Sequence, residues 1–210
     1  MFTEKDLQQI AAHGLTPEAV EHQIENFRRG FPFLNVKAAA SPDNGGVKKL
    51  TEEEAQAYAA AFDAARADKR VVKFVPASGA ATRMFKELFE YVNDDKRTAG
   101  IDKLIVNLEK FAFFPELAKY LKPQIDDKDV VRNIIINGLE YGAKPKGLVT
   151  FHAYKQGARK PVEEHLVEAA LYASNGERAI IHFTVSPEHQ AGFEALLAER
   201  QSYYEELYGV

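Results

Sequence analysis

The chain has 210 residues, of which 46% are hydrophobic and 28% are charged, and its formal net charge is −4. This length suits one or two small domains with a sizeable core, and the acidic balance argues against a general nucleic-acid-binding face. The absence of cysteine excludes disulfides, thiolate catalysis and cysteine-bound metals, and no apolar run approaches the length of a membrane span. Because residues 1–6 also contain no apolar signal region, we expect a cytoplasmic protein.

The first 70 residues are predicted to form an N-terminal helical extension. Thr3 is placed to cap one helix, and Thr16-Pro17-Glu18 combines a capping hydroxyl, a proline and an acid at the start of a second. Residues 31–50 are rich in proline and glycine and are expected to be a loop or linker. Its apolar side chains are expected to anchor it to the core: Phe31, Phe33, Leu34 and Val36. Thr51 and Glu54 form a capping-box pattern that begins an alanine-rich helix ending near Ala67.

A strand, a loop of small residues and a helix are predicted next. Val71–Val75 is a short apolar run rich in β-branched residues, and we expect a helix over Thr82–Tyr91. The loop between them holds almost no side-chain volume, so its backbone N–H groups can approach a ligand closely. Strand, small loop and helix is the arrangement that binds phosphate in many α/β proteins. The predicted phosphate-binding residues are Ala77, Ser78, Gly79, Ala80, Ala81 and Thr82.

A helical block at about residues 93–143 interrupts the α/β pattern, with helices expected over Ile101–Phe114 and Asp129–Leu139. The α/β pattern then resumes in five segments. These are a strand Leu148–His152, a turn Gly157–Lys160, a helix from Pro161 to about Ala173, a strand Arg178–Val185 and a helix from Pro187 to about Tyr208. We therefore predict an α/β domain over residues 71–210 that carries a helical insertion.

Strands separated by helices imply parallel pairing through right-handed crossovers. The predicted fold class is α/β, with an incomplete doubly wound parallel sheet. Only about three strands are predicted, and parallel strands need both faces covered. We therefore expect this chain to be an N-terminal fragment, or a short family member that lacks a second half.

Four segments follow one another in an order that identifies a possible relative. They are Ala77-Ser78-Gly79-Ala80-Ala81-Thr82-Arg83-Met84, Pro145-Lys146-Gly147-Leu148, Lys160-Pro161-Val162-Glu163-Glu164-His165-Leu166-Val167-Glu168-Ala169-Ala170, and Ser186-Pro187-Glu188-His189. In this order they resemble the nucleotidyltransferases that make nucleotide-sugars, namely the UDP-sugar pyrophosphorylases and sugar-1-phosphate nucleotidyltransferases. The resemblance covers about residues 71–205. The whole chain also resembles an uncharacterised bacterial family of unknown function whose members are generally longer.

The resemblance implies a glycosyltransferase-A-type fold and a reaction. A sugar-1-phosphate oxygen attacks the α-phosphorus of a nucleoside triphosphate, and pyrophosphate leaves. By the resemblance, the amides of Gly79–Thr82 hold phosphate, Arg83 balances the pyrophosphate charge and Lys146 contacts the α-phosphate. A Mg²⁺ ion bridges the phosphates, and its carboxylate ligands come from later in the chain in that family. The implied partners are a nucleoside triphosphate and a sugar phosphate, with no nucleic acid and no membrane, together with the missing C-terminal half of the protein.

The sequence departs from the family pattern at two points. Ala81 replaces the third glycine of the loop, which is tolerable only if its φ is negative. About sixty residues separate Arg83 from Lys146, so the helical block must loop out and return Lys146 to the site. Two functions stay open: a nucleotidyltransferase-like enzyme, and a non-catalytic α/β module that binds a nucleotide or a partner protein.

The remaining polar residues are given structural roles. The 77–82 loop is not a Walker loop, because no Gly-Lys-Ser/Thr follows it. His165 is expected to be buried and hydrogen-bonded, whereas His13, His22 and His189 do not form a ligand-spaced set. The paired acids are interpreted as first-turn, solvated or loop residues: Asp94-Asp95, Asp126-Asp127 and Glu163-Glu164.

Overall fold

The computed structural model describes residues 2–210 and divides into two compact units, Met1–Ala55 and Gln56–Val210. The first unit contains α1 (Glu4–Ala12) and α2 (Pro17–Arg29). The hydroxyls of Thr3 and Thr16 accept hydrogen bonds from the backbone in the first turn of each helix. Gly30 ends α2 with a positive φ of 72°, which glycine adopts without strain. The helix starts predicted from these threonines are therefore confirmed.

The linker over residues 31–50 contains no helix or strand. The prediction that its apolar side chains are anchored in a core is wrong, because Phe33 is 103% exposed and Leu34 is 88% exposed. Phe31 and Val36 are exposed as well. Pro32 removes a backbone N–H donor from this segment, which disfavours a helix or strand there.

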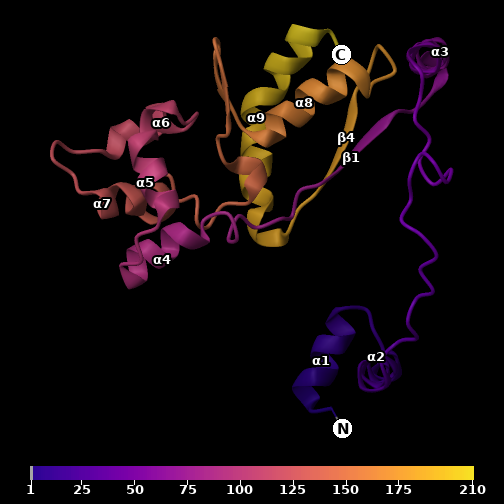
Figure 1. Cartoon of the computed structure of the whole chain (residues 1–210), viewed down its shortest axis with the longest axis horizontal. Helices are drawn as coiled ribbons and strands as arrows, with labels where there is room; N and C mark the ends of the chain where they lie inside the picture. The colour runs from indigo at the N-terminus through magenta and orange to yellow at the C-terminus, as the bar shows by residue number, and fades with distance from the viewer. Residues whose placement is uncertain (1) are drawn as a thin grey trace. The chain divides into compact units, whose positions relative to one another are not determined.

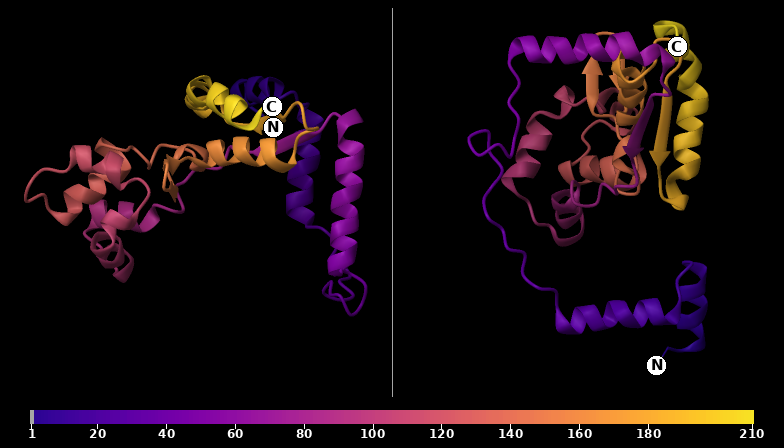
Figure 2. Two further views of the ribbon diagram at one scale, coloured as in Figure 1. Left: turned by 90° about the horizontal axis from the view of Figure 1, so that it is seen from above. Right: turned by 90° about the vertical axis from the view of Figure 1, so that its right-hand side faces the viewer.

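The second unit contains a small parallel sheet. β1 (Val72–Pro76) pairs with β4 (Ile180–Thr184), in a register that runs from Val72 opposite Ile180 to Pro76 opposite Thr184. The two strands lie side by side and point the same way in the right-hand view of Figure 2. The predicted α/β class with parallel pairing is confirmed, and the sheet consists of these two strands within residues 2–210.

Three further helices begin where the sequence predicts. The capping box at Thr51 is formed by reciprocal bonds of 3.2 and 3.0 Å with Glu54, and it starts α3 (Glu52–Ala65). α8 (Pro161–Tyr172) and α9 (Pro187–Tyr208) each begin with a proline. They pack together around a small core that Phe183 of β4 joins (Figure 1). That core consists of Val162, Phe193 and Leu196.

The segment between the helical block and α8 differs from the prediction. Lys146–Leu148 forms a 3₁₀ turn, and β2 (His152–Tyr154) pairs antiparallel with β3 (Gly157–Arg159). The predicted strand Leu148–His152 and turn Gly157–Lys160 are therefore wrong. Val149 is fully buried in the core of the helical block, so it packs as irregular chain instead of pairing in a sheet. Gly157, with φ 133°, turns the chain into β3.

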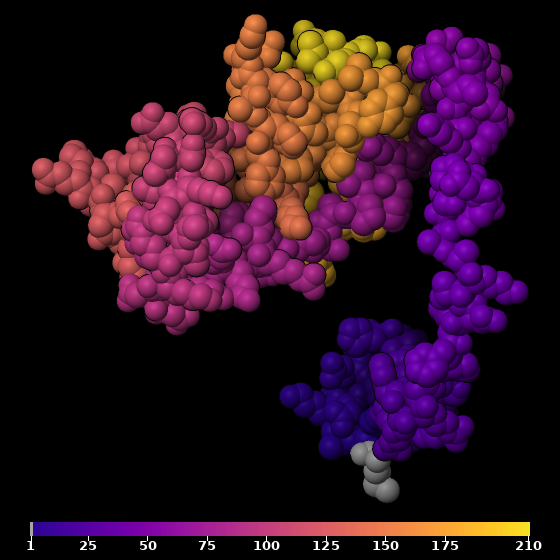
Figure 3. Space-filling model, in the orientation of Figure 1, coloured from indigo at the N-terminus to yellow at the C-terminus, as the bar shows by residue number. Residues whose placement is uncertain are grey.

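The helical block forms one hydrophobic core. Figure 3 shows the outer surface of this block in pink. Its α-helices are α4 (Lys86–Asp94), α5 (Ala99–Val106), α6 (Phe114–Leu117) and α7 (Asp127–Arg132). A π-helix over Asn133–Asn137 follows α7, so both long helices predicted for this block are shorter and divided. Its most deeply buried large side chains include Ile101, Leu117, Val131, Ile134 and Tyr141.

Candidate functional site

The predicted phosphate loop follows the carboxyl end of β1. The Ala77 N–H still donates to the Thr184 carbonyl at 2.8 Å, so the chain leaves the sheet after Ala77. The prediction of a helix from Thr82 is wrong, because α4 begins at Lys86. Residues 82–85 instead form a turn in which the N–H groups of Met84 and Phe85 donate to the Ala81 carbonyl at 2.9 and 3.3 Å. No helix N-terminus therefore lies directly at the loop.

Burial explains this turn. Ala81 is 1% exposed and Phe85 is 6% exposed, and both belong to the core of the helical block. The Phe85 ring stacks on the Tyr141 ring with centroids 6.1 Å apart. Burial raises the pKa of Tyr141, whose hydroxyl oxygen accepts a hydrogen bond from the Thr150 N–H at 3.3 Å. The loop is thus fixed at its far end by apolar packing.

The middle of the loop presents free backbone donors. Within residues 2–210, the N–H groups of Ser78, Gly79 and Ala80 make no hydrogen bond. All three residues are exposed, so water or a ligand must satisfy these donors. Three consecutive free amides on a loop without bulky side chains can hold an anion such as a phosphate group.

Packing does not require a glycine at position 79. Gly79 does not have a left-handed φ, and a Cβ built on it would meet nothing within 4 Å. A glycine without a steric or conformational reason suits a close approach of a ligand to the backbone. Ala81 also lacks a positive φ, so the alanine that replaces the family's third glycine is conformationally acceptable there.

The structure brings Lys146 next to this loop. Ala80 and Pro145 form an isolated antiparallel bridge, and the Lys146 N–H donates to the Gly79 carbonyl at 3.2 Å. Pro145 is fully buried, whereas the Lys146 side chain is exposed. The helical block therefore loops out and returns the chain to Gly79, as the prediction for Lys146 required.

Arg83 lies in the turn that follows the loop, and its side chain is exposed. In the described part of the chain, neither Arg83 nor Lys146 forms a side-chain hydrogen bond or an ion pair. The two cations are therefore available to an anionic ligand.

The residues around the loop do not fit a magnesium site. Residues 2–210 contain no group of three or more histidine, cysteine or acidic side chains that could hold a metal ion. The paired acids have structural roles: Asp95 pairs with Lys128, Asp126 caps α7, and Asp127 pairs with Arg97 at 2.7 Å.

His165 and a second histidine, His182, have structural contacts. His165 is half-buried, and its Nδ1 lies 2.8 Å from Oε2 of Glu168, which Lys73 contacts at 2.7 Å. The ammonium of Lys73, with a smaller contribution from His165, holds the pKa of Glu168 below its usual value. His182 stacks on Phe74 with ring centroids 5.1 Å apart.

Glu163 is buried, contrary to the expectation from the sequence. Glu163 lies in the first turn of α8, as expected, but it is only 4% exposed. The interpretation of this residue as a solvated acid is therefore wrong. Its Oε1 accepts from Nε of Arg200 at 2.8 Å and from the hydroxyl of Tyr204 at 3.0 Å, while Oε2 accepts from the Lys160 N–H at 2.9 Å. Arg200 and Tyr204 lie four residues apart on α9, so their side chains are on the same face of the helix. This spacing is the sequence signal for a shared polar partner.

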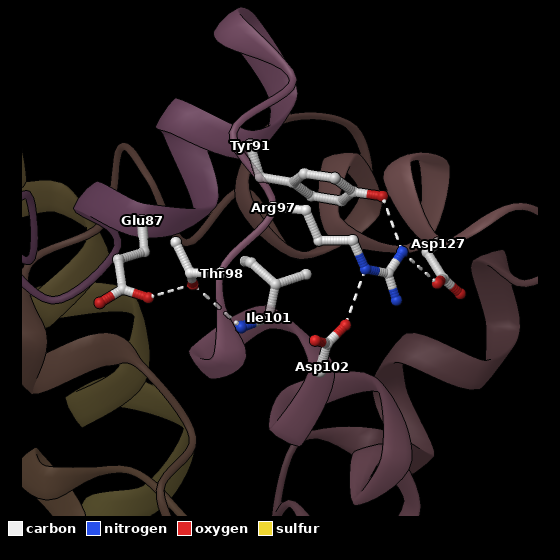
Figure 4. Close-up of polar contacts among 7 residues, drawn as sticks. All are labelled: Glu87, Tyr91, Arg97, Thr98, Ile101, Asp102 and Asp127. Atoms are coloured by element: carbon white, nitrogen blue, oxygen red, sulfur yellow. Dashed lines mark hydrogen bonds and ion pairs between the residues drawn. The ribbon is translucent and has the colours of Figure 1, made fainter.

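Arg97 holds together three helices of the block that follows the loop (Figure 4). Its Nε donates to Asp102 of α5 at 2.7 Å, and its Nη1 donates to Asp127 of α7 at 2.7 Å and to the Tyr91 hydroxyl of α4 at 3.3 Å. Hydrogen bonds to Asp102 and Asp127 raise the pKa of Arg97. Because these partners come from three elements, the guanidinium fixes the position of α4 relative to α5 and α7.

Replacing Arg97 by alanine is expected to lower the melting temperature more than replacing Arg132, which forms a local ion pair with Asp129. The reason is that Arg97 bonds to residues of three separate helices, whereas Arg132 bonds to a residue three positions earlier in the same helix, α7. Thermal denaturation of both variants tests this, and a double-mutant cycle with Asp127→Asn measures the coupling. Equal melting temperatures for Arg97→Ala and Arg132→Ala would contradict this role.

Comparison with known proteins assigns the chain to a family. The second unit contains a parallel strand pair, and the loop that follows β1 has free amides and two cations in the segments that adjoin it. These features define an α/β protein with a candidate anion-binding loop. The model of the family described as a domain of unknown function (DUF4301) matches residues 3–210, and the chain belongs to this family. No curated protein and no solved structure matches the chain. None of the helices formed by residues 2–210 has the length and apolar character needed to cross a membrane.

Proposed function

We propose that this chain is the N-terminal, phosphate-binding portion of a nucleotidyltransferase-like enzyme that joins a nucleoside triphosphate to a sugar-1-phosphate. The observation that carries the proposal is the exposed backbone of Ser78, Gly79 and Ala80, whose N–H groups are free in the described structure. The exposed cations Arg83 and Lys146 lie in the segments that adjoin this loop. Free amides and unpaired cations together favour a polyanionic ligand.

In the proposed reaction, an oxygen of the sugar-1-phosphate forms a bond to the α-phosphorus, and the bond from that phosphorus to the leaving pyrophosphate breaks. The amides of the 77–82 loop hold phosphate oxygens, Lys146 contacts the α-phosphate, and Arg83 stabilises the charge that develops on pyrophosphate. Positioning and charge neutralisation are the protein's contribution, because phosphoryl transfer requires little covalent participation by side chains.

The second candidate is a non-catalytic α/β module that binds a nucleotide or a partner protein. The absence of a metal-ligating cluster within residues 2–210 favours it for this chain by itself. The two candidates differ in one measurable respect. Only the enzyme releases pyrophosphate when it is given a nucleoside triphosphate, a sugar-1-phosphate and Mg²⁺.

The Gly79→Val variant tests the binding site. We expect at least one of UTP, CTP, GTP and ATP, each with Mg²⁺, to raise the melting temperature of the wild type. Valine at position 79 is expected to leave the melting temperature of the free protein unchanged, because an added Cβ meets nothing within 4 Å. It is expected to weaken nucleotide binding by about tenfold or more, because its methyl groups hold phosphate away from the free amides. Isothermal titration calorimetry gives the affinity.

Ala158→Val, at an exposed position of β3, provides the control for an enlarged side chain. It is expected to leave nucleotide affinity unchanged. No thermal shift of the wild type with any of the four nucleotides would count against the site. Equal affinities for the wild type and Gly79→Val would show that the nucleotide binds elsewhere.

A further inference from the structure

A groove of about 680 Å³ lies between the turn after the loop, α4, α5 and the chain near Phe111 and Phe151. We name it the α4–α5 groove. Its volume is within the range of small-molecule sites, about 300–1,000 Å³. Met84, Phe111 and Phe151 remain 41%, 38% and 40% exposed, so apolar surface is open to a ligand. Its apolar walls include Met84, Leu88, Leu104, Phe111, Phe113 and Phe151.

The uncharged and acidic polar side chains of the groove already have partners. Oε2 of Glu87 accepts from the Thr98 hydroxyl at 2.6 Å, as Figure 4 shows. The Asn107 amide nitrogen donates to the Lys103 carbonyl at 2.8 Å, and its Oδ1 accepts from Lys110 at 2.8 Å. The walls therefore present mainly hydrocarbon to a bound molecule.

The groove also carries cationic side chains. Arg83, Lys86 and Lys103 line it, against one carboxylate, that of Glu87. Lys86 lies 3.6 Å from Glu90, whereas Arg83 and Lys103 form no ion pair within residues 2–210. A ligand that complements this site has an apolar body and a negatively charged head.

We propose that the α4–α5 groove binds a long-chain alkyl phosphate, with its hydrocarbon chain against the apolar walls and its phosphate monoester held by Arg83 and Lys103. A nucleobase or a sugar would leave its hydrogen-bonding groups unpaired against these walls, which is costly, whereas a hydrocarbon chain has none to satisfy. A dianionic phosphate also matches two unpaired cations, and the arginine fork can bind it through two hydrogen bonds. This inference goes beyond the proposed function, because it requires no nucleotide.

Isothermal titration calorimetry with dodecyl phosphate, below its critical micelle concentration, tests the inference. The wild type is expected to bind it more tightly than dodecanoate and much more tightly than dodecyl maltoside or inorganic phosphate. Lys103→Ala is expected to weaken dodecyl phosphate binding by about tenfold, while Lys119→Ala, at an exposed lysine of the same block, leaves the affinity unchanged. Met84→Glu places a like charge on the wall and is expected to abolish binding. Met84→Gln, which keeps the side-chain length, is expected to weaken it.

Circular dichroism of each variant establishes that the block is folded. Absence of dodecyl phosphate binding by the wild type would overturn the inference. If dodecyl maltoside binds as tightly as dodecyl phosphate, the role of the cations is overturned. If dodecanoate binds more tightly than dodecyl phosphate, the preference for a phosphate head is overturned. If inorganic phosphate binds as tightly as dodecyl phosphate, the role of the apolar groove is overturned. Gly79→Val is expected to leave dodecyl phosphate affinity unchanged, so failure here is distinguishable from failure of the proposed nucleotide site.

Discussion

Replacing Glu163 by alanine is expected to lower the free energy of unfolding by about 3 kcal/mol. The carboxylate is 4% exposed, and its removal leaves Arg200, Tyr204 and the Lys160 N–H without their acceptor. A tyrosine hydroxyl is protonated at neutral pH, and burial raises the pKa of Tyr204 further, so this hydroxyl is a donor that needs an acceptor. The expected cost is at the lower end for a broken buried pair, because Arg200 is about one third exposed to solvent.

Urea denaturation of matched variants measures this effect. Glu199→Ala, at an exposed position of the same helix α9, is expected to change the free energy of unfolding by less than about 0.5 kcal/mol. Glu163→Gln keeps an acceptor for Tyr204 but loses the charge, so an intermediate cost is expected. The double variant Glu163→Leu/Arg200→Leu is expected to regain part of the loss, because it removes both charges. A cost for Glu163→Ala no larger than for Glu199→Ala would contradict the buried role.

The helix starts could be predicted because they depend on local chemistry. A threonine hydroxyl or a proline at the first helical position acts within one turn, so the starts of α1, α2, α3, α8 and α9 follow from a few adjacent residues. The parallel pairing of β1 with β4 could also be predicted, since helices between apolar strands require a crossover. These features need no knowledge of distant packing.

The errors occurred where distant packing decides the local structure. Thr82–Phe85 has a helical pattern, but the chain forms a turn there because Ala81 and Phe85 are buried in a core built by residues far along the sequence. Val149 has strand propensity but packs as irregular chain in the same core. Glu163 lies at a position that normally favours a solvated acid, and only α9, some forty residues later, buries it.

The candidate site could be predicted only in part. The small side chains of the 77–82 loop indicated accessible amides, and the free N–H groups of Ser78, Gly79 and Ala80 agree with that expectation. The approach of Lys146 to Gly79 depends on how the whole helical block folds, so order along the sequence could suggest it but could not establish it. The α4–α5 groove had no sequence signal, because its apolar residues have the same spacing as ordinary core residues.

The double variant Arg83→Ala/Lys146→Ala is expected to lower kcat/KM for pyrophosphate release by about a thousandfold or more, with a nucleoside triphosphate, a sugar-1-phosphate and Mg²⁺. Both side chains are exposed and form no ion pair within residues 2–210, so their loss is expected to leave the fold unchanged and to remove positive charge from the phosphates. Charge that develops on the leaving pyrophosphate is stabilised more in the transition state than in the ground state, so kcat is expected to fall as well as affinity.

The control is Arg70→Ala/Lys155→Ala, which removes the same total charge from two other exposed positions. It is expected to keep the turnover of the wild type. If the wild type binds a nucleotide but releases no pyrophosphate, the result supports the non-catalytic module and contradicts the enzyme. If both double variants lose turnover equally, general electrostatic attraction explains the loss, because a specific contact would depend on position. A large loss confined to Arg83→Ala/Lys146→Ala requires these two cations to act at the phosphates, since net charge and fold are the same in the control.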